Sequence, residues 1–488
     1  MGSAAGTFGG SQMVSGIVRG CACALALVSS GTAALAQFGG TPIVPGDTFR
    51  RPAPPPAAVA PPAPPAVAAP ARPAATANTI SQPAPPVRTA SVSLSPEPIY
   101  DEGTRARLSA AFELYSAIEA RGGWPAVPKS AQFIPGGRGA EVALLRQRLA
   151  ATADLDPRAA AGDAYDEALV AAVKRFQARH GLTETGSIGP QTLEALNVPV
   201  ETRVRQLAAS LERLAGMSFL FGHRYVVVNI PAAVVEAVTD GRVERRYVAV
   251  VGKPDRPSPT LTASITAVNL NPTWTVPLSI AKKDVVPKMR KDPAYLSRMH
   301  MRLLDSAGNE IDPSQVDWHS DRVPAFAIRQ DPGAWNALGS VRVDMPNAYS
   351  VYMHDTNHKN LFSGDYRFQS SGCTRVSDPR DFAAWLLQDN KGWSRREIDA
   401  GIATGQRTDI RLAHALPVAW IYLTGWGSRD GTVNFRPDPY GHDARPVKPF
   451  MVSLPHPMVT AARSSGFTLQ SEESRPAVIR EVSYLDSQ

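Results

Sequence analysis

Cysteine is scarce in this sequence: its 488 residues contain three, at Cys21, Cys23 and Cys373. The first two lie in an N-terminal segment that has the features of an export signal, so the exported chain would keep only Cys373. A lone thiol excludes an internal disulfide, and an unpaired cysteine in an exported protein is a candidate reactive group. A buried, inert thiol is the other common fate of a free cysteine.

Long apolar runs are also missing. The strongest one, at 13–37 (MVSGIVRGCACALALVSSGTAALAQ), is broken by polar and small residues at 29–32 and ends in Ala34-Leu35-Ala36. A membrane-spanning helix needs about 20 continuous apolar residues, whereas this pattern is typical of a cleavable secretory signal. We therefore expect a signal peptide over residues 1–36 and a periplasmic protein. Export argues against a nucleic-acid partner, although the net charge of +7 would permit one.

Acidic residues are absent between Pro52 and Glu97, a stretch that together with Pro98 holds 15 of the 44 prolines. Proline and alanine dominate residues 37–98, which predicts an extended, disordered tether of polyproline character without a core. Over the whole chain 43% of residues are hydrophobic and 19% charged, which fits globular protein elsewhere. The length allows several domains.

Helical periodicity follows the tether. Apolar spacing predicts helices at residues 101–119, 141–151, 165–179, 189–196 and 200–217. The first and last would build a helical scaffold, residues 99–137 with 199–220, around a small all-α module at 138–198. His180-Gly181 supplies a glycine C-cap for the third helix, and a histidine at a helix end is more often structural than a metal ligand.

After residue 220 the pattern changes to strands. Predicted strands lie at residues 225–231, 246–252, 264–270, 341–345, 348–354 and 416–423. We expect a mainly β catalytic domain at 221–443, followed by a tail at 444–488. Residues 281–325 interrupt it with a basic, helical-looking segment, either a lid insertion or a solvated surface. The predicted fold class is multidomain α+β.

The candidate catalytic residues are His354 and Cys373. Alternation along the predicted strand 348–354 places Tyr352 and His354 on one face. Cys373 follows Gly372 in a turn ahead of a helix that begins at Asp378-Pro379. Such a turn exposes a sulfur and directs amides at an oxyanion, and a nearby imidazole can lower the thiol pKa through a Cys⁻/His⁺ pair.

The segment H-D-T-N-H, from His354 to His358, superficially resembles a zinc motif. It follows a strand pattern, Asp355 replaces the usual Glu, and no third ligand stands at a sensible spacing. We therefore expect neither a metal nor another cofactor.

Taken together, H-D-T and S-S-G-C-T-R-V (370–376) resemble the signature of the L,D-transpeptidases, in particular their large periplasmic Gram-negative branch. NPTWTVPLSI (271–280), RQDPGAWNALG (329–339) and GGW (122–124) extend the resemblance. KRFQARHGL and TGSIGPQTLEALN, both within residues 138–198, resemble the peptidoglycan-binding module of cell-wall enzymes.

The resemblance implies acyl transfer on peptidoglycan stem peptides in cell wall biogenesis. Cys373 would form a thioester with the third residue of a tetrapeptide stem, releasing D-Ala. An amine of a second stem would then accept the acyl group, giving a 3-3 cross-link. His354 would act as the base, the insertion at 281–325 would cover the donor stem, and carbapenems would acylate the cysteine.

The remaining site residues are also assigned through the resemblance. The main-chain carbonyl of Asp355 would orient the imidazole, so that its side chain need not matter. The amides of Gly372 and Cys373, together with the Tyr352 hydroxyl, would hold the oxyanion. Arg375 and Ser371 are candidates for binding substrate, although a structural ion pair is an equally good explanation of Arg375.

Three alternatives stay open from the sequence. Water could resolve the same thioester, giving an L,D-carboxypeptidase or endopeptidase. The acceptor could be an outer-membrane protein that becomes anchored to peptidoglycan. A non-enzymatic wall-binding protein with an inert cysteine fits the module and the tether but leaves the grouping of histidine, tyrosine and Gly-Cys unexplained.

Overall fold

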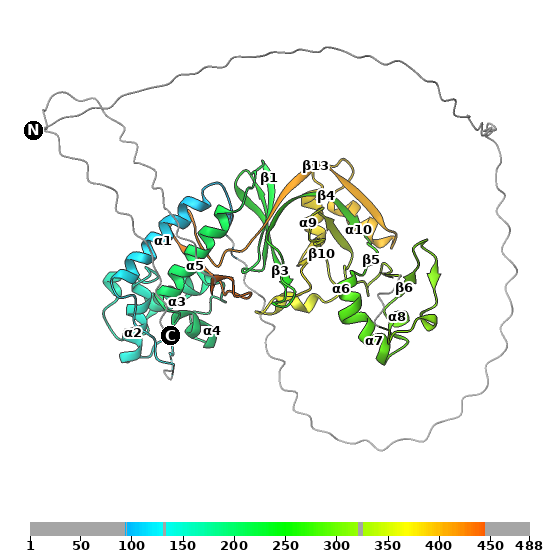
Figure 1. Ribbon diagram of the computed structural model, residues 1–488. Coiled ribbons are helices and arrows are strands. Elements are labelled where there is room, and N and C mark those ends of the chain that lie inside the picture. Colours follow the sequence, from blue (N-terminus) through cyan, green and yellow to red (C-terminus); the bar gives the residue numbers. More distant parts are fainter. Residues whose placement is uncertain (1–92, 94, 130–132, 321–325, 445–488) are drawn as a thin grey trace, which may run out of the picture. The chain divides into compact units, whose positions relative to one another are not determined.

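The computed structural model describes residues 93, 95–129, 133–320 and 326–444, which are coloured in Figure 1. The predicted signal peptide, most of the tether and nearly all of the tail lie outside these residues. All of the described residues fall within one compact unit. Within them, no helix is both long enough and apolar enough to cross a membrane.

The five predicted N-terminal helices are present. They are α1 (Thr104–Ala120), α2 (Ala140–Ala150), α3 (Glu167–Arg179), α4 (Pro190–Leu196) and α5 (Val200–Ala215). Asp166 caps α3 by accepting a hydrogen bond from the Leu169 amide. The helix ends at His180, and Gly181 follows in the left-handed region with φ +69°, which confirms the predicted glycine stop.

A nine-stranded sheet forms the centre of the catalytic part, in the order β11-β3-β12-β10-β9-β4-β13-β1-β2. Its strands are β1 (Arg224–Asn229), β2 (Val234–Thr239), β3 (Arg242–Gly252), β4 (Leu261–Leu270), β9 (Val341–Asp344), β10 (Met353–His354), β11 (Phe368–Ser370), β12 (Thr374–Val376) and β13 (Thr408–Ile421). Because β2 also pairs with β3, the sheet closes on itself. A small hairpin follows, β14 (Gly425–Gly427) with β15 (Val433–Phe435).

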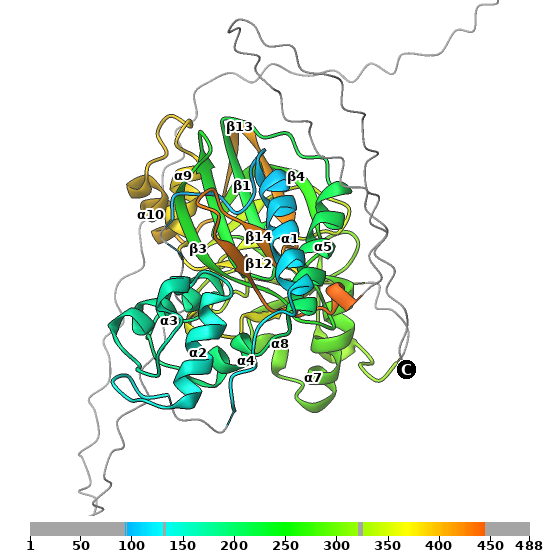
Figure 2. The ribbon, with the colours of Figure 1, turned by 90° about the vertical axis from the view of Figure 1, so that its left-hand side faces the viewer.

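The closed sheet has two buried faces. Val226 and Val228 point into a core that includes Phe382 of α9 (Pro379–Leu386), and α10 (Arg395–Ala403) adds to this core. Tyr225 and Val227 point to the other side, into a core shared with α1 and α5. Figures 1 and 2 show α1 and α5 side by side beside the sheet. The predicted helical scaffold is therefore a layer of the catalytic fold.

The insertion differs from its prediction as a helical segment. It follows α6 (Leu278–Ile280), and its first half is helical, through the π-helix η2 (Ala281–Val285), α7 (Val286–Lys291) and α8 (Tyr295–Arg298). The second half contributes β6 (Met301–Leu304) and β7 (Glu310–Ile311) to a four-stranded sheet with β5 (Trp274–Thr275) and β8 (Ala327–Gln330). The turn at Asp305, whose carboxylate accepts from the Ala307 and Asn309 amides, reverses the chain between β6 and β7.

Two further expectations need correction. The predicted strand 348–354 is regular only at Met353–His354, because Ser350 has φ +54°, which is incompatible with an extended strand. The C-terminal boundary predicted for the tether, residue 98, lies too far along the chain. Arg246 donates to the carbonyls of Ser95 and Glu97, and the Val243 amide donates to the carbonyl of Pro96. Residues 95–98 therefore pack on the catalytic sheet.

The small module is joined to the β14–β15 hairpin by α3. Arg179, at the end of α3, pairs with Asp154 at 2.5 Å and donates to the Val433 carbonyl at 3.1 Å, and both charged groups are buried. The His180 ring stacks on Phe176 and faces Phe435 at 3.9 and 5.8 Å between centroids. His180 is thus a packed structural residue, as expected.

We predict that Leu207→Ala, on α5, lowers the free energy of unfolding by about 2–5 kcal/mol. Leu207 is fully buried between α5 and the catalytic part, where it packs against Gly425. The measurement is urea unfolding followed by circular dichroism, with Leu220→Ala as the control because Leu220 is 85% exposed. Equal midpoints for the two variants would contradict the assignment of α5 as a layer of the catalytic fold.

Candidate active site

Three short strands carry a row of polar side chains across the sheet. His354 of β10 lies opposite Arg342 of β9 on one side and opposite Arg375 of β12 on the other. Directly paired residues point to the same face, and Val343 and Met353, their neighbours in sequence, point into the core. The row therefore lies on the opposite face, with the histidine between two guanidinium groups.

Cys373 immediately precedes β12 and is partly buried. The Thr374 amide donates to the Tyr352 carbonyl at 3.1 Å, which holds the end of the cysteine turn beside the start of β10. Gly372 has φ +113°, a conformation that favours glycine, and its carbonyl accepts from the Ser258 hydroxyl at 2.7 Å. The structure thus places Cys373, directly ahead of β12, beside the strand that carries His354, as the sequence suggested.

The imidazole of His354 is held at one nitrogen. Its Nδ1 is hydrogen-bonded to the main-chain carbonyl of Asp355. A carbonyl can only accept, so Nδ1 carries the proton in the neutral ring and Nε2 keeps a free lone pair. Burial, with the Arg375 charge next in importance, lowers the pKa of His354 to about 3. The ring is therefore a neutral base over the whole physiological pH range.

The resting thiol is neutral as well. Burial raises the pKa of Cys373 to about 11, against a smaller lowering by a backbone hydrogen bond from Tyr352 and by the charges of Arg375 and Arg342. The expected Cys⁻/His⁺ pair is therefore wrong for this resting state. Desolvation opposes both ions, and sequence patterns carry no information about desolvation.

The candidate oxyanion groups are not equivalent. The Gly372 amide already donates to the Ser370 hydroxyl at 3.2 Å, whereas the Cys373 amide has no hydrogen-bond partner among the residues that the structure describes. The Tyr352 ring lies 5.7 Å from the His354 ring, and the Arg342 guanidinium lies 5.2 Å from the Tyr352 ring centroid. The free donors near the sulfur are thus the Cys373 amide and the Tyr352 hydroxyl.

Arg375 and Ser371 occupy different settings. Within the described ranges Arg375 forms no ion pair, and its buried Nε has no protein partner, which argues against the alternative of a structural ion pair. Ser371 is exposed and accepts from Arg256 at 3.1 Å. Arg256 also pairs with Asp284 of η2 at 2.5 Å, so the nucleophile turn is linked to the insertion.

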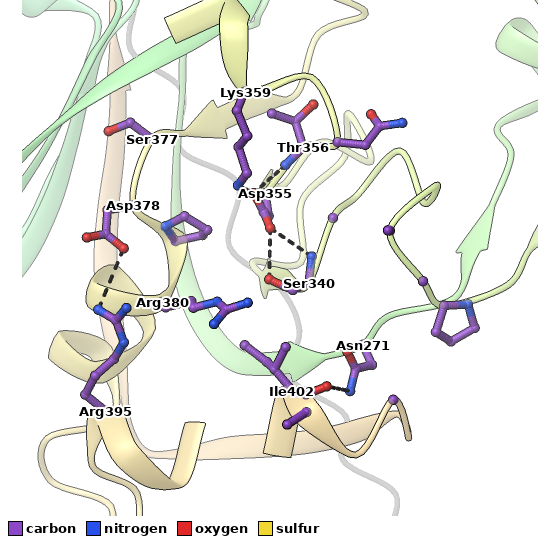
Figure 3. Close-up of a pocket in the computed structure, with 18 residues that line it drawn as sticks. Asn271, Ser340, Asp355, Thr356, Lys359, Ser377, Asp378, Arg380, Arg395 and Ile402 are labelled. Atoms are coloured by element: carbon purple, nitrogen blue, oxygen red, sulfur yellow. Dashed lines mark hydrogen bonds and ion pairs between the residues drawn. The ribbon is translucent and has the colours of Figure 1, made fainter. Parts of the chain in front are cut away.

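A cavity of about 710 Å³ opens beside this row and is drawn in Figure 3. Asp355, Ser340 and Lys359 line it, but Cys373 and His354 do not. The catalytic geometry, rather than the cavity, therefore defines the site. His358, the second histidine of H-D-T-N-H, is exposed and follows the strand in an irregular turn.

Sequence reasoning missed several residues around the site. Arg342 and Arg256 were not singled out, since one lies in a predicted strand and the other in a loop that is distant in sequence. The sequence does not reveal which strands are neighbours in the sheet, so it could not place Arg342 beside His354. Trp274 of β5 is another neighbour of the site: burial raises the pKa of the Tyr352 hydroxyl, and the nearby Trp274 side chain opposes that rise.

Comparison with known families settles the class of this domain. The model described as "L,D-transpeptidase catalytic domain" matches residues 223–408, and that described as "Putative peptidoglycan binding domain" matches residues 138–196. Residues 223–408 form an L,D-transpeptidase catalytic domain. The expected family and the α+β fold class are thereby confirmed, while the Gram-negative branch stays a prediction.

Individual relatives match only part of this chain. A curated protein of Haemophilus influenzae, "Putative L,D-transpeptidase", is 31% identical over 52% of each chain, so this chain spans about half of that relative. A solved L,D-transpeptidase from Mycobacterium smegmatis is 18% identical, covering 41% of this chain and 58% of its own, with a TM-score of 0.21. One from Stackebrandtia nassauensis is 13% identical, covering 63% and 99%, with a TM-score of 0.23. The assignment therefore rests on the domain models.

We predict that alkylation of Cys373 in the transpeptidase domain continues to accelerate beyond pH 10, because its pKa lies near 11. An ordinary thiol would level off above about pH 8.5. Arg375→Gln should slow the reaction further, since Arg375 lowers the thiol pKa, and a one-unit shift means about a tenfold lower rate. The measurement is iodoacetamide labelling quantified on the Cys373 peptide, with Arg380→Gln on α9 as the control. A plateau near pH 8 would contradict the neutral resting thiol.

Proposed function

We propose that this protein is an L,D-transpeptidase that acts through a Cys373 thioester on peptidoglycan tetrapeptide stems. One observation carries the proposal: within a domain of this family, the nucleophile turn lies beside a histidine whose tautomer leaves Nε2 free to accept a proton. The reaction of the exported protein would be 3-3 cross-linking of peptidoglycan in cell wall biogenesis.

In the first step, the Cys373 sulfur attacks the carbonyl of the third stem residue while its proton passes to Nε2 of His354. Negative charge then develops on the carbonyl oxygen, where the Cys373 amide and the Tyr352 hydroxyl can donate. The carbon–nitrogen bond to D-Ala breaks, and the imidazolium returns the proton to the departing amine. The products are a thioester and free D-Ala.

In the second step, an amine of another stem attacks the thioester carbonyl. His354 accepts a proton from this amine, the carbon–sulfur bond breaks, and the proton returns to the sulfur. A new amide is formed and the thiol is restored. Because both groups are neutral at rest, charge separation is confined to the moment at which the oxyanion and its donors are present.

Positive charge around the site fits a substrate rich in carboxylates. Arg375 has no carboxylate partner within the described ranges, and Lys282, Lys288 and Arg290 lie on the helical half of the insertion. Arg375 is therefore our candidate for holding a stem carboxylate, with Ser371 at the adjoining turn. The link from Ser371 through Arg256 to η2 supports a role of the insertion over the donor stem.

The module at 138–198 would hold glycan or stem peptide, because it matches a peptidoglycan-binding family and contains no cysteine. Both domain types are associated with the cell wall, which supports a periplasmic location. The alternative acceptor of the acyl group is an outer-membrane protein.

We predict that Cys373→Ala abolishes D-Ala release from disaccharide tetrapeptides, because the sulfur is the attacking atom. Mass spectrometry of the products also decides the reaction type: a cross-linked dimer indicates transpeptidation, and a free tripeptide indicates hydrolysis. Thermal unfolding of the variant serves as the folding control. Release of D-Ala by folded Cys373→Ala above trace level would remove the thioester mechanism, and a wild-type protein that only binds peptidoglycan would favour the non-enzymatic alternative.

We also predict one covalent adduct after carbapenem treatment, located on Cys373. The sulfur would open the lactam by breaking its carbon–nitrogen bond, forming a thioester while the ring nitrogen takes a proton. Intact-protein and peptide mass spectrometry would locate the adduct. Cys373→Ser is the matched variant, and acylation of it at the wild-type rate would count against the assignment.

A further inference from the structure

Asp355 follows the catalytic histidine, and its amide, its carbonyl and both of its carboxylate oxygens are hydrogen-bonded. Its amide donates to the Val341 carbonyl at 2.8 Å, and its carbonyl holds Nδ1 of His354. The side chain is buried, being only 5% exposed, although it lines the cavity of Figure 3. A buried carboxylate requires compensating partners, so its surroundings show whether it is built into the site.

The partners of this carboxylate account for both oxygens. Oδ2 accepts from the amide and the hydroxyl of Ser340, each at 2.9 Å, and Oδ1 accepts from the Thr356 amide at 2.6 Å. Figure 3 shows the Ser340 and Thr356 bonds converging on the side chain. Lys359 adds an ion pair with Oδ1. Three hydrogen bonds and one cation thus fix this group.

The chain opposite Asp355 is shaped to admit the carboxylate. Gly339 has φ +58°, and a Cβ there would overlap Cγ and Oδ2 of Asp355 and lie 2.7 Å from its Cβ. Gly339 and Ser340 lead directly into β9, the strand that pairs with β10. The side chain therefore ties the residue after the histidine to the neighbouring strand, independently of the regular pairing.

We propose that the Asp355 carboxylate is a positioning residue of the transpeptidase reaction. By fixing the peptide plane of Asp355, it aims the main-chain carbonyl that keeps the proton of His354 on Nδ1 and leaves Nε2 free to accept a proton. The inference rests on the proposed function for its kinetic consequence. It goes beyond the expectation from sequence, which assigned a role to the carbonyl alone.

The first variant is Asp355→Ala in the full chain. Loss of the anchor should reduce kcat for D-Ala release about 10- to 100-fold, by analogy with the loss found when the hydrogen-bond partner that orients a metal-ligating histidine is removed. KM should stay within about twofold, because substrate contacts are unchanged. ¹⁵N NMR of the histidines, with His354 assigned by its loss in His354→Gln, should show a shift of its neutral ring toward the Nε2–H tautomer.

Conservative variants separate positioning from folding. Asp355→Asn keeps the shape and one acceptor oxygen, so it should recover part of kcat and of the Nδ1–H tautomer. Lys359→Met removes only the ion pair at a half-exposed position and should have a smaller effect than Asp355→Ala. Ser377→Ala, on the same cavity wall without a side-chain bond to Asp355, is the matched control.

The outcomes are distinguishable. A folded Asp355→Ala with wild-type kcat, or with lower kcat but an unchanged His354 tautomer, would overturn the positioning role. If the Ala variant does not fold, Asp355→Asn and Lys359→Met decide by the same two measurements. If the wild-type protein releases no D-Ala, the proposed function fails, yet the tautomer measurement still tests the positioning of His354.

Discussion

The parallel pairing of β10 with β12 is the constraint on which the site depends. These strands are two and three residues long, and β10 is paired to β9 on its other side. Such short strands cannot hold a register alone, so two further hydrogen bonds help to fix it. The Thr374 amide donates to the Tyr352 carbonyl, and the Ser258 hydroxyl donates to the Gly372 carbonyl. Through them, residues 19 positions apart in sequence become neighbours on one face.

Burial then determines the electrostatics. The same sheet that aligns Cys373 and His354 buries the histidine and shields much of the cysteine, which raises the pKa of the thiol and lowers that of the imidazole, so that the resting groups are neutral. Arg342 and Arg375 stand on either side and favour the thiolate while disfavouring the imidazolium. This arrangement suits a reaction in which charge has to appear only together with the oxyanion and its donors.

The rest of the chain supports this row by covering the sheet. α1 and α5, separated by the whole module, pack together against one face, while α9 fills the other. The module is attached to the β14–β15 hairpin through buried contacts of Arg179 and His180. Binding and chemistry can therefore be assigned to different segments although these segments share a common packed structure.

The sequence alone determined the periodic elements and the reactive residue types. Helices α1 to α5, the Asp378 cap of α9 and the pair His354 and Cys373 follow from local spacing and side-chain chemistry. It missed β2, although Asp240-Gly241, both at positive φ, is a recognisable hairpin turn. Only the tertiary structure decided the strand content of the insertion, the break at Ser350, the place of Arg342 and the direction of the pKa shifts. Each of these depends on strand order or desolvation, which arise from contacts between segments that are distant in sequence.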